Sequence, residues 1–521
     1  MKRDTMLDRV RSRKEPWDLL VIGGGATGAG IAVDATTRGY ETLLVERSDF
    51  GQGTSSRSTK LVHGGVRYLR QGNISLVMES LEERGILRQN APHLVKDLRF
   101  VVPRYDWWEA PFYGIGLKIY DLLAGKYGFD PSRLLSKDET IEEIPTVRRD
   151  GLRGGVLYHD GQFDDARLLL DIVRTAADHG GCVLNYTRVT SLLKGADGLI
   201  TGASALDVES GEELRIEARA VVNATGPFCD GVRKMDEPGA AALISPSQGV
   251  HIVLDRSFLP RRSAIMVPHT RDGRILFAIP WHGRTLVGTT DTQVAEVALE
   301  PRALPAEIDY LLETAATVLE KAPTRKDVLS CFAGIRPLVN EKGSESTASL
   351  SRDHTILVSP AGLVTIAGGK WTTYRKMAED CVDRAAMVAQ GPRRPCVTRE
   401  LRIHGYHANP EELGKLAIFG SDAEEVRAII ASDPDLDALL HERLPARLHD
   451  VVHAARFEMA RTLEDVLSRR TRSLLLDARA AVEAAPRAAT LLARELGRDT
   501  AWEKAQVEAF ATLARGYVVE G

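Results

Sequence analysis

Cysteine is scarce in this chain, and its few cysteines lie far apart. They are odd in number, form no Cys-x-x-Cys pair, and stand at Cys182, Cys229, Cys331, Cys381 and Cys396. This spacing excludes a disulfide framework and a thiolate zinc site, and no other metal-ligand spacing stands out. The pattern therefore predicts a protein of a reducing compartment that holds no metal.

Long apolar runs and an excess of positive charge are also missing. No stretch reaches about eighteen uninterrupted apolar residues, so we expect no membrane-spanning helix. The basic N-terminal segment contains no apolar core, so we expect no signal peptide. The 68 lysines and arginines are balanced by 72 acidic residues, which leaves no positive field to collect nucleic acid. Nucleic acid is accordingly not an expected partner, and we expect a cytoplasmic protein.

Three common catalytic motifs are absent as well. The chain has no Gly-x-Ser-x-Gly and no His-Glu-x-x-His. Gly369-Lys370 is followed by tryptophan, where a P-loop requires serine or threonine. The absences exclude the nucleophile elbow of α/β-hydrolases, the zinc site of metalloproteases and the phosphate loop of NTPases.

The chain does contain enough apolar residues to form several domains. Its 521 residues, 44% of them apolar, predict two or three domains. The apolar run 17–22 stops at three glycines, as a buried parallel strand would. Residues 28–39 then predict a helix of small side chains, and residues 41–46 a second strand. Strand, glycine turn, helix and strand together predict a βαβ unit.

The pattern changes twice further along the chain. Residues 181–223 hold three runs rich in β-forming residues, separated by glycine-containing turns. A further strand at 363–367 leads into two glycines and a helix over about 373–390. Residues 411–518 show helical spacing and almost no strand signal, which predicts a separate helical domain.

The glycine turn has the spacing of a dinucleotide-binding loop. Gly23, Gly25 and Gly28 allow, in turn, a tight turn, the approach of a pyrophosphate and close packing of helix on strand. Glu46 ends the second strand, where a carboxylate can bind a ribose hydroxyl pair. NAD and FAD share this architecture, so the loop alone does not choose between them. The tract 51–68, dense in hydroxyls, glycines and cations, is not needed by a simple NAD domain.

Two long segments resemble the signatures of FAD-dependent glycerol-3-phosphate dehydrogenases. Residues 22–39 match the N-terminal signature of that family, and residues 368–378 match its second signature. Shorter segments that are similar to the family are STKLVHGGVR (58–67), VNATGP (222–227), GVHIV (249–253), IPWHGRTLVGTTD (279–291), GIRPL (334–338) and EDVLSRRT (464–471). The resemblance runs from about residue 17 to the end of the chain.

The resemblance implies an α/β chain with a glutathione-reductase-like FAD-binding fold, a β-rich substrate domain and an all-helical C-terminal domain. Motif order predicts that the FAD-binding domain is discontinuous, over 17–75, 151–230 and 331–395. Segments 76–150 and 231–330 would form the substrate or cap domain, and 400–521 the helical domain. The residues expected at the FAD are Gly23, Gly25, Gly28, Glu46, Thr54, Ser55, Lys60, Val189, Thr225, Gly226, Gly334, Gly368, Gly369 and Thr372.

The resemblance also implies a phosphate monoester with a secondary alcohol as substrate. The groups expected to bind it are Arg67, Tyr68, Arg336, Lys370 and Thr373, with the guanidinium forks matching phosphate geometry. A base must take the hydroxyl proton as hydride leaves for flavin N5, and the alternatives are His63, the first choice, and His251. Arg336 would alternatively stabilise the developing alkoxide.

The expected reaction is oxidation of sn-glycerol 3-phosphate to dihydroxyacetone phosphate, with electrons passing from FAD to a membrane quinone. An oxidase that uses O₂, an enzyme for another substrate such as an amino acid, and a non-catalytic flavoprotein remain alternatives. The aromatic-rich segment 105–129 places Phe112, Ile115, Ile119 and Leu122 on one helical stripe. Such a stripe fits peripheral contact with the inner face of the cell membrane, or alternatively an ordinary core helix. A homodimer is a further candidate partnership.

Overall fold

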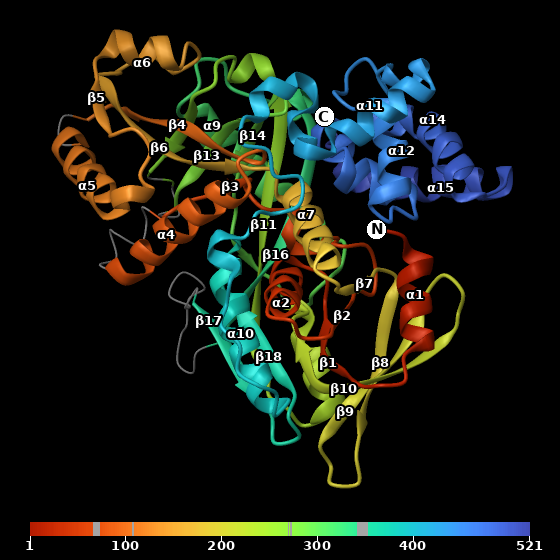
Figure 1. Cartoon of the computed structure of the whole chain (residues 1–521). Coiled ribbons are helices and arrows are strands. Elements are labelled where there is room, and N and C mark those ends of the chain that lie inside the picture. Colours follow the sequence, from red (N-terminus) through yellow and green to blue (C-terminus); the bar gives the residue numbers. More distant parts are fainter. Residues whose placement is uncertain (66–72, 107–108, 269, 271–273, 341–352, 521) are drawn as a thin grey trace.

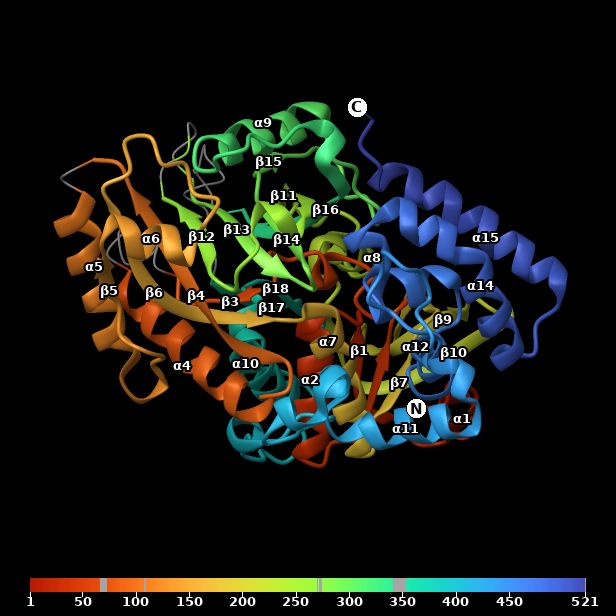
Figure 2. The ribbon, with the colours of Figure 1, turned by 90° about the horizontal axis from the view of Figure 1, so that it is seen from above.

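The computed structural model describes residues 1–65, 73–106, 109–268, 270, 274–340 and 353–520, and the side chains of 109–115 and 126 are not among them. The chain folds into two β-sheets, helices packed against them, and a C-terminal block of helices (Figure 1). Seen from above, the helical block lies on the side opposite helices α4 and α5 (Figure 2).

The first sheet has the strand order β17-β18-β10-β1-β2-β7. The bounds are β1 Trp17–Ile22, β2 Thr42–Val45, β7 Cys182–Leu184, β10 Glu213–Asn223, β17 His354–Val358 and β18 Val364–Gly368. Strand β1 pairs in parallel with both β2 and β10, and its apolar run is buried, as the sequence predicts. Strands β8 (Thr187–Lys194) and β9 (Ile200–Asp207) extend β10 as an antiparallel arm.

Three helices pack together against this sheet. They are α2 (Ala26–Thr37), α7 (Asp165–Asp178) and α10 (Tyr374–Val388), and their apolar side chains share one buried cluster with the strands. Helix α1 (Arg3–Ser12) packs beside β7, and α8 (Cys229–Asp236) beside β10. The predicted helix over 28–39 is thus confirmed with its start at Ala26, and the helix expected from 373 begins at Tyr374.

The second sheet has the order β15-β11-β14-β13-β12-β4-β6-β3, with β16 paired to β11 and β5 to β6. The bounds are β3 Leu61–Val62, β4 Val95–Arg104, β5 Arg133–Leu135, β6 Gly154–Phe163, β11 Ile244–Asp255, β12 Ala264–Val267, β13 Leu276–Trp281, β14 Arg284–Gly288, β15 Thr292–Gln293 and β16 Val328–Val339. The helices around it are α4 Ile74–Asn90, α5 Glu109–Ala124, α6 Lys137–Glu143 and α9 Pro305–Ala316. Strands β3, β6 and β16 lie in segments assigned above to the FAD-binding domain, yet they hydrogen-bond into this sheet. The domain bounds stay a prediction.

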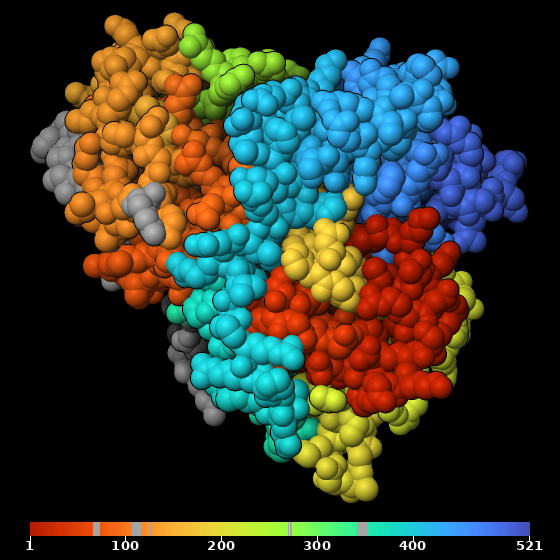
Figure 3. All heavy atoms as spheres, in the orientation of Figure 1, coloured from red at the N-terminus to blue at the C-terminus, as the bar shows by residue number. Residues whose placement is uncertain are grey.

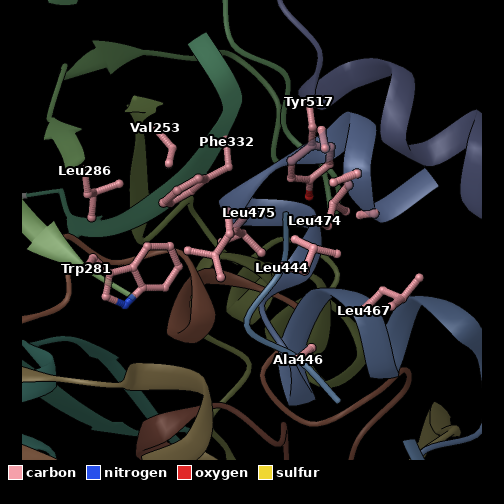
Figure 4. Close-up of a cluster of buried hydrophobic side chains, with 14 of the residues drawn as sticks. Val253, Trp281, Leu286, Phe332, Leu444, Ala446, Leu467, Leu474, Leu475 and Tyr517 are labelled. Carbon is pink, nitrogen blue, oxygen red and sulfur yellow. The ribbon is translucent and has the colours of Figure 1, made fainter. Parts of the chain in front are cut away.

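The described residues beyond 400 form helices and turns and carry no strand of either sheet. The bounds are η8 Pro410–Asp422, α11 Ala423–Ser432, η9 Pro434–Asp437, α12 Leu448–Phe457, the π-helix η10 Asp465–Arg470, α13 Ser473–Leu476, α14 Ala478–Leu496 and α15 Thr500–Ala514. Figure 4 shows side chains of this block, such as Leu474 and Leu475, packed beside Phe332 of the second sheet in one apolar cluster. The helical domain therefore shares a core with the second sheet, and Figure 3 shows that it also abuts the N-terminal segment.

No helix among the described residues is long and apolar enough to cross a membrane.

Candidate active site

Two neighbouring cavities meet at the start of α10. The larger one, the glycine-loop cavity, has a volume of about 540 Å³, and the smaller one, the histidine cavity, about 310 Å³. Residues that line both are Thr54, Pro337, Gly368, Gly369, Lys370 and Trp371. A flat group at this shared wall would be exposed to both cavities at once.

The glycine-loop cavity lies at the carboxyl end of β1, over the first turn of α2. A Cβ on Gly28 would lie 1.8 Å from the carbonyl oxygen of Gly23, and Gly23 itself has a φ of +112°. Only glycine tolerates both conditions. Helix α2 begins after Gly25, which has no side chain to cap it. The Ala26 N–H donates to the Ser55 hydroxyl at 2.9 Å, and the N–H groups that follow it at this helix start can receive a pyrophosphate.

Glu46 lies at the end of β2 on the wall of the same cavity. Its carboxylate accepts hydrogen bonds from the backbone N–H of Gly24 at 2.7 Å and of Ser48 at 2.9 Å. Burial raises the pKa of Glu46, and these two N–H groups oppose that rise only in part. A half-buried carboxylate with remaining lone pairs beside the glycine loop fits a ribose hydroxyl pair.

The shared wall is built from two glycines and a helix start. Gly368 and Gly369 have φ values of +76° and +80°, and a short turn from Trp371 to Thr373 then leads into α10. The indole N–H of Trp371 donates to the carbonyl of Ser55 at 2.9 Å, which joins this wall to the loop after β2. The wall thus presents a positive helix end and backbone N–H groups toward both cavities.

Arg336 is a firmly anchored cation of the histidine cavity. Its guanidinium donates to the Oγ1 of Thr289 at 3.2 Å and to the carbonyl of Thr290 at 2.9 Å. It also lies 3.3 Å from the carboxylate of Asp291, which in turn lies 3.8 Å from Arg274. Two guanidinium groups therefore lie on one carboxylate at the wall of a small cavity, a suitable setting for a dianion.

The two candidate bases line this same cavity but differ in their surroundings. His251 is buried, and its Nε2 lies 2.9 Å from the Oγ1 of Thr59. Burial, together with the charges of Lys60 and Arg336, holds the pKa of His251 well below its usual value, so this ring is neutral at pH 7. His63 is half-buried. Its position is set by the next residue, Gly64, whose N–H donates to the Tyr120 hydroxyl at 2.8 Å.

Most of the predicted site residues lie on these two walls. Those at the glycine-loop cavity are Gly23, Gly25, Glu46, Thr54, Ser55, Val189, Thr225, Gly226, Gly368 and Gly369, and those at the histidine cavity include His63, His251, Gly334, Arg336, Lys370 and Thr372. Gly28 lies behind the wall, where it allows the packing of α2 on β1. Arg67 and Tyr68 lie outside the described residues.

Two predicted residues are placed differently from the expectation. The Lys60 ammonium is buried away from both walls, where it donates to both carboxylate oxygens of Asp165 at 2.8 Å. The expectation that this side chain lines the flavin is corrected, because a buried ammonium requires a carboxylate partner. Thr373 is also buried off both walls, and its hydroxyl bonds the Lys370 carbonyl at 3.4 Å. It serves the helix start and not the substrate cavity.

The structure also adds residues that the motifs did not single out. Arg274, Asp291 and Thr59 line the histidine cavity. Arg47 lies over the ring of Phe228 at 4.0 Å, and both line the glycine-loop cavity. Asp291 ends a segment that resembles the family, so that segment could have indicated it. Arg274 lies in no matched segment, and no signal in the sequence marks it.

The loop after β2 is bonded to the helical domain. Asp49 is fully buried and accepts from the Arg470 guanidinium at 2.9 Å and from Arg469. Burial alone would raise the pKa of Asp49, but the charges of Arg470 and Arg469 outweigh it, and the carboxyl pKa lies below its usual value. Residues 51–55 of this loop line the glycine-loop cavity. The helical domain therefore holds one wall of that cavity.

Known proteins share both parts of this architecture. A family model described as FAD dependent oxidoreductase matches residues 18–375, and one described as the C-terminal domain of alpha-glycerophosphate oxidase matches residues 364–505. The chain is 41% identical to a mitochondrial glycerol-3-phosphate dehydrogenase of Macaca fascicularis, over 97% of this chain and 74% of that protein. It is 42% identical to the mitochondrial glycerol-3-phosphate dehydrogenase SDP6 of Arabidopsis thaliana, over 95% and 85%.

A solved structure extends the likeness to the whole fold. The glycerol-3-phosphate dehydrogenase of Bacillus halodurans complexed with FAD superposes with a TM-score of 0.80 at 32% identity, over 99% of this chain and 98% of that one. An L-alpha-glycerophosphate oxidase of Mycoplasma pneumoniae, at 18% identity and a TM-score of 0.57 over 74% of this chain and 97% of that one, shows the fold alone. The predicted FAD-binding fold with a helical C-terminal domain is confirmed. This chain belongs to the family of FAD-dependent glycerol-3-phosphate dehydrogenases.

Proposed function

We propose that this enzyme oxidises sn-glycerol 3-phosphate to dihydroxyacetone phosphate and passes the electrons to a membrane quinone. The observation that carries the proposal is the shared wall at Gly368–Trp371, which joins a dinucleotide-sized cavity to a small cavity with cations and histidines. The residues of the larger cavity fit FAD, with the glycine loop at the pyrophosphate and Glu46 at the ribose. When bound, FAD supplies flavin N5 as the hydride acceptor.

The remaining chemistry belongs to side chains of the histidine cavity. His63 is proposed to take the proton of the C2 hydroxyl, because it is half-buried at the cavity wall and next to an anchored glycine. His251 is the alternative base, since its neutral ring already shares a hydrogen bond with the Thr59 hydroxyl, as donor or as acceptor. The two assignments differ in exposure, since His63 is half-buried and His251 is buried.

Phosphate recognition is assigned to Arg336 and Lys370, with Arg67 and Tyr68 kept as predictions. The Arg336 fork is held by Gln248, Thr289, Thr290 and Asp291 and is therefore preorganised for a planar, bidentate contact. The structure supports adding Arg274 to this set, because it shares the Asp291 carboxylate with Arg336. A site with several guanidinium groups favours a phosphate dianion over the single carboxylate of an amino acid.

Exposed apolar side chains on two neighbouring helices support the choice of a membrane quinone as acceptor. On α5, Leu117 and Tyr120 face the core, whereas Ile119 is 44% and Leu122 80% exposed. Helix α4 packs beside α5 and exposes Ile74 and Met78, as Figures 1 and 2 let the reader follow. An exposed apolar patch across two helices is a candidate for peripheral membrane contact. The patch supports our proposal that the enzyme contacts a membrane, and its location on the inner face of the cell membrane stays a prediction.

The substrate assignment is tested by anaerobic titration of the flavin. Purified holoenzyme should lose its oxidised-flavin absorbance when glycerol 3-phosphate is added without oxygen, and glycerol without phosphate should leave it nearly unchanged. Bleaching by an amino acid and not by glycerol 3-phosphate would overturn the assignment.

The acceptor is tested on the reduced enzyme. Reoxidation by a quinone in liposomes should be faster than reoxidation by air-saturated buffer, and replacing Ile119 and Leu122 with serine should slow only the former. Rapid reoxidation by O₂ with hydrogen peroxide as product would favour the oxidase alternative.

A further inference from the structure

One wall of the histidine cavity is a short connecting segment, residues 57–60. It joins the turn η1 (Thr54–Ser56) to strand β3, and its first three residues line the cavity. The segment belongs to no helix or strand, so the regular hydrogen bonds of secondary structure do not fix Ser58 and Thr59. Their positions depend on the side chains around them.

A single carboxylate holds this segment. Asp165, the first residue of α7, is fully buried and accepts from the backbone N–H of Ser58 at 3.1 Å and from its hydroxyl at 2.7 Å. The Lys60 ammonium donates to both oxygens of the same carboxylate at 2.8 Å and to the carbonyl of Ser56 at 2.7 Å. These contacts lie on both sides of Thr59 in the chain, so they fix it from both sides.

The ion pair of Lys60 and Asp165 lies in apolar surroundings. Neither side chain is exposed, and the ammonium lies 5.2 Å from the ring centroid of Trp281 and 5.3 Å from that of Phe332. Figure 4 shows these two rings in the apolar cluster that the second sheet shares with the helical domain. Separating the two charges here would leave both buried and uncompensated. The pair therefore fixes the segment relative to α7.

Thr59 uses this position to meet a histidine that is itself confined. Its hydroxyl lies 2.9 Å from the Nε2 of His251. The imidazole stacks on the ring of Phe332, with centroids 5.0 Å apart and an interplanar angle of 17°. A Cβ on Gly288 would lie 2.1 Å from the Cδ2 of the imidazole, so that edge is closely packed as well. Because the imidazole has little room to follow, the hydrogen bond depends on where Thr59 is held.

Neither Lys60 nor Asp165 lines the histidine cavity, so both reach it through the segment that they hold. We propose that this buried ion pair positions the cavity for oxidation, because it keeps the Thr59 hydroxyl against His251. The inference rests on the proposed function, in which the histidine cavity receives the substrate alcohol. The ammonium also supports the ring by its charge: burial, with the charges of Lys60 and Arg336, keeps the pKa of His251 low and the ring neutral.

Two variants and their combination test whether Asp165 acts through Thr59. Thr59→Val removes the hydroxyl at nearly constant shape, and Asp165→Asn removes the charge that holds the segment. In stopped-flow experiments with glycerol 3-phosphate, each should slow flavin reduction roughly ten- to hundredfold, the scale of a misplaced reacting group. The half-saturating substrate concentration should stay within about threefold, since the pair does not hold Arg336. The double variant should be only as slow as Asp165→Asn, because both changes break one hydrogen bond.

The hydrogen bond can also be observed without substrate. In holoenzyme labelled with ¹⁵N-histidine, the Nε2 signal of His251 is assigned by its loss in His251→Gln. This signal should shift in Thr59→Val, and it should shift in the same direction in Asp165→Asn. If Asp165→Asn does not yield folded protein, Ser58→Ala takes its place. It removes only the hydroxyl bond to the carboxylate and should give a smaller shift of the same sign.

Asp207→Asn is the matched control. Asp207 is also a buried carboxylate, pairs with the buried Arg3 and accepts from the hydroxyl of Ser210, but it lines neither cavity of the active site. Its loss should lower stability and leave both the histidine signal and the rate of flavin reduction as in the wild type.

Two results would overturn the positioning role. One is a double variant in which the two losses of rate multiply, and the other is a His251 signal that neither Asp165→Asn nor Ser58→Ala shifts. A wild-type flavin that glycerol 3-phosphate does not reduce would instead contradict the proposed function. The NMR comparison would then still decide the role of the ion pair, since it needs no substrate.

Discussion

The glycine loop itself and the interface with the helical domain are built in opposite ways. At the loop, close contacts join residues near in sequence, as between Glu46 and the N–H of Gly24, which are 22 positions apart. At the interface, buried charges join residues such as Asp49 and Arg470, which are 421 positions apart. Backbone geometry shapes the first region, and long-range ion pairs shape the second.

This difference decides how each region responds to change. A glycine loop fails when an atom is added, since no space exists for it. A buried ion pair fails when a charge is removed, because the partner is left uncompensated. If the charges at the interface also hold the cofactor loop, the interface does more than attach the helical domain. Substitutions at the loop, at the candidate base and at the interface separate these effects.

The largest effect is expected at the glycine loop. Gly28→Ala places a Cβ 1.8 Å from the Gly23 carbonyl oxygen, so α2 must move away from β1. We expect purified protein without flavin and without activity, measured as flavin absorbance per chain. Gly239→Ala is the matched control, because a Cβ there meets nothing within 4 Å. Full flavin content in Gly28→Ala would show that the loop tolerates the shift.

His63→Ala should leave that loop intact and remove only the base. The expected loss is about two to four decades of kcat, the usual range for general-base catalysis, with flavin content unchanged. Stopped-flow flavin reduction is the measurement. Reduction at nearly the normal rate would assign the proton transfer to His251, whose variants would then carry the loss.

Asp49→Asn tests whether the interface holds the cofactor loop. Removing this charge leaves Arg470 with only the Glu458 carboxylate, 3.9 Å away, while Arg469 keeps Glu464 and Asp465. The loss of stability should therefore be at most about 3–5 kcal/mol. The affinity for FAD should fall roughly tenfold or more, since residues 51–55 lose their anchor. Hydrogen exchange of the 49–56 peptide should rise in the holoenzyme.

Asp422→Asn is the control for that experiment. Asp422 pairs with Arg174 at the same interface, is also buried, and lies on neither active-site cavity. Its loss should lower the melting temperature while FAD affinity stays within about twofold. Equal loss of FAD in the two variants would mean that Asp49 acts only through domain docking.

The smallest effect is a pH dependence at the interface. Burial would lower the pKa of His404, but its bonds to Asp178 and Asp422 outweigh burial and raise that pKa to about 9. Because the folded pKa exceeds the unfolded value, this stabilisation is full below about pH 6.5 and is lost as pH rises through 9. Its upper limit is about 3 kcal/mol at low pH.

The free energy of unfolding, measured in urea at pH 6 and at pH 9.5, gives the contribution of His404 to stability. His404→Asn should remove most of the difference between the two pH values. His407→Asn should keep it, since the neighbouring His407 makes no ion pair with a described carboxylate. An unchanged pH dependence in His404→Asn would locate the titration elsewhere.

Local pattern predicted the elements around the cofactor well. The β1 strand is present with the expected bounds, and the helix after Gly25 and the strand ending before Glu46 are present with bounds shifted by one or two residues. The wall at Gly368–Trp371 could also be predicted from the sequence, because its two positions with left-handed backbone require glycine. The role of Lys60 could not be predicted, since its motif suggested a flavin contact while its ion-pair partner, Asp165, lies 105 positions away in the sequence.

The sequence by itself determined the FAD-binding loop, the family and the helical character of the C-terminal part, because each rests on short-range spacing. Only the tertiary structure decided that Arg274 joins Arg336 at Asp291, that Arg470 holds Asp49, and that Asp165 pairs with Lys60. A charged side chain takes its role from the partner it meets on burial, and that partner is chosen by how the sheets and the helical domain pack, not by its neighbours in the chain.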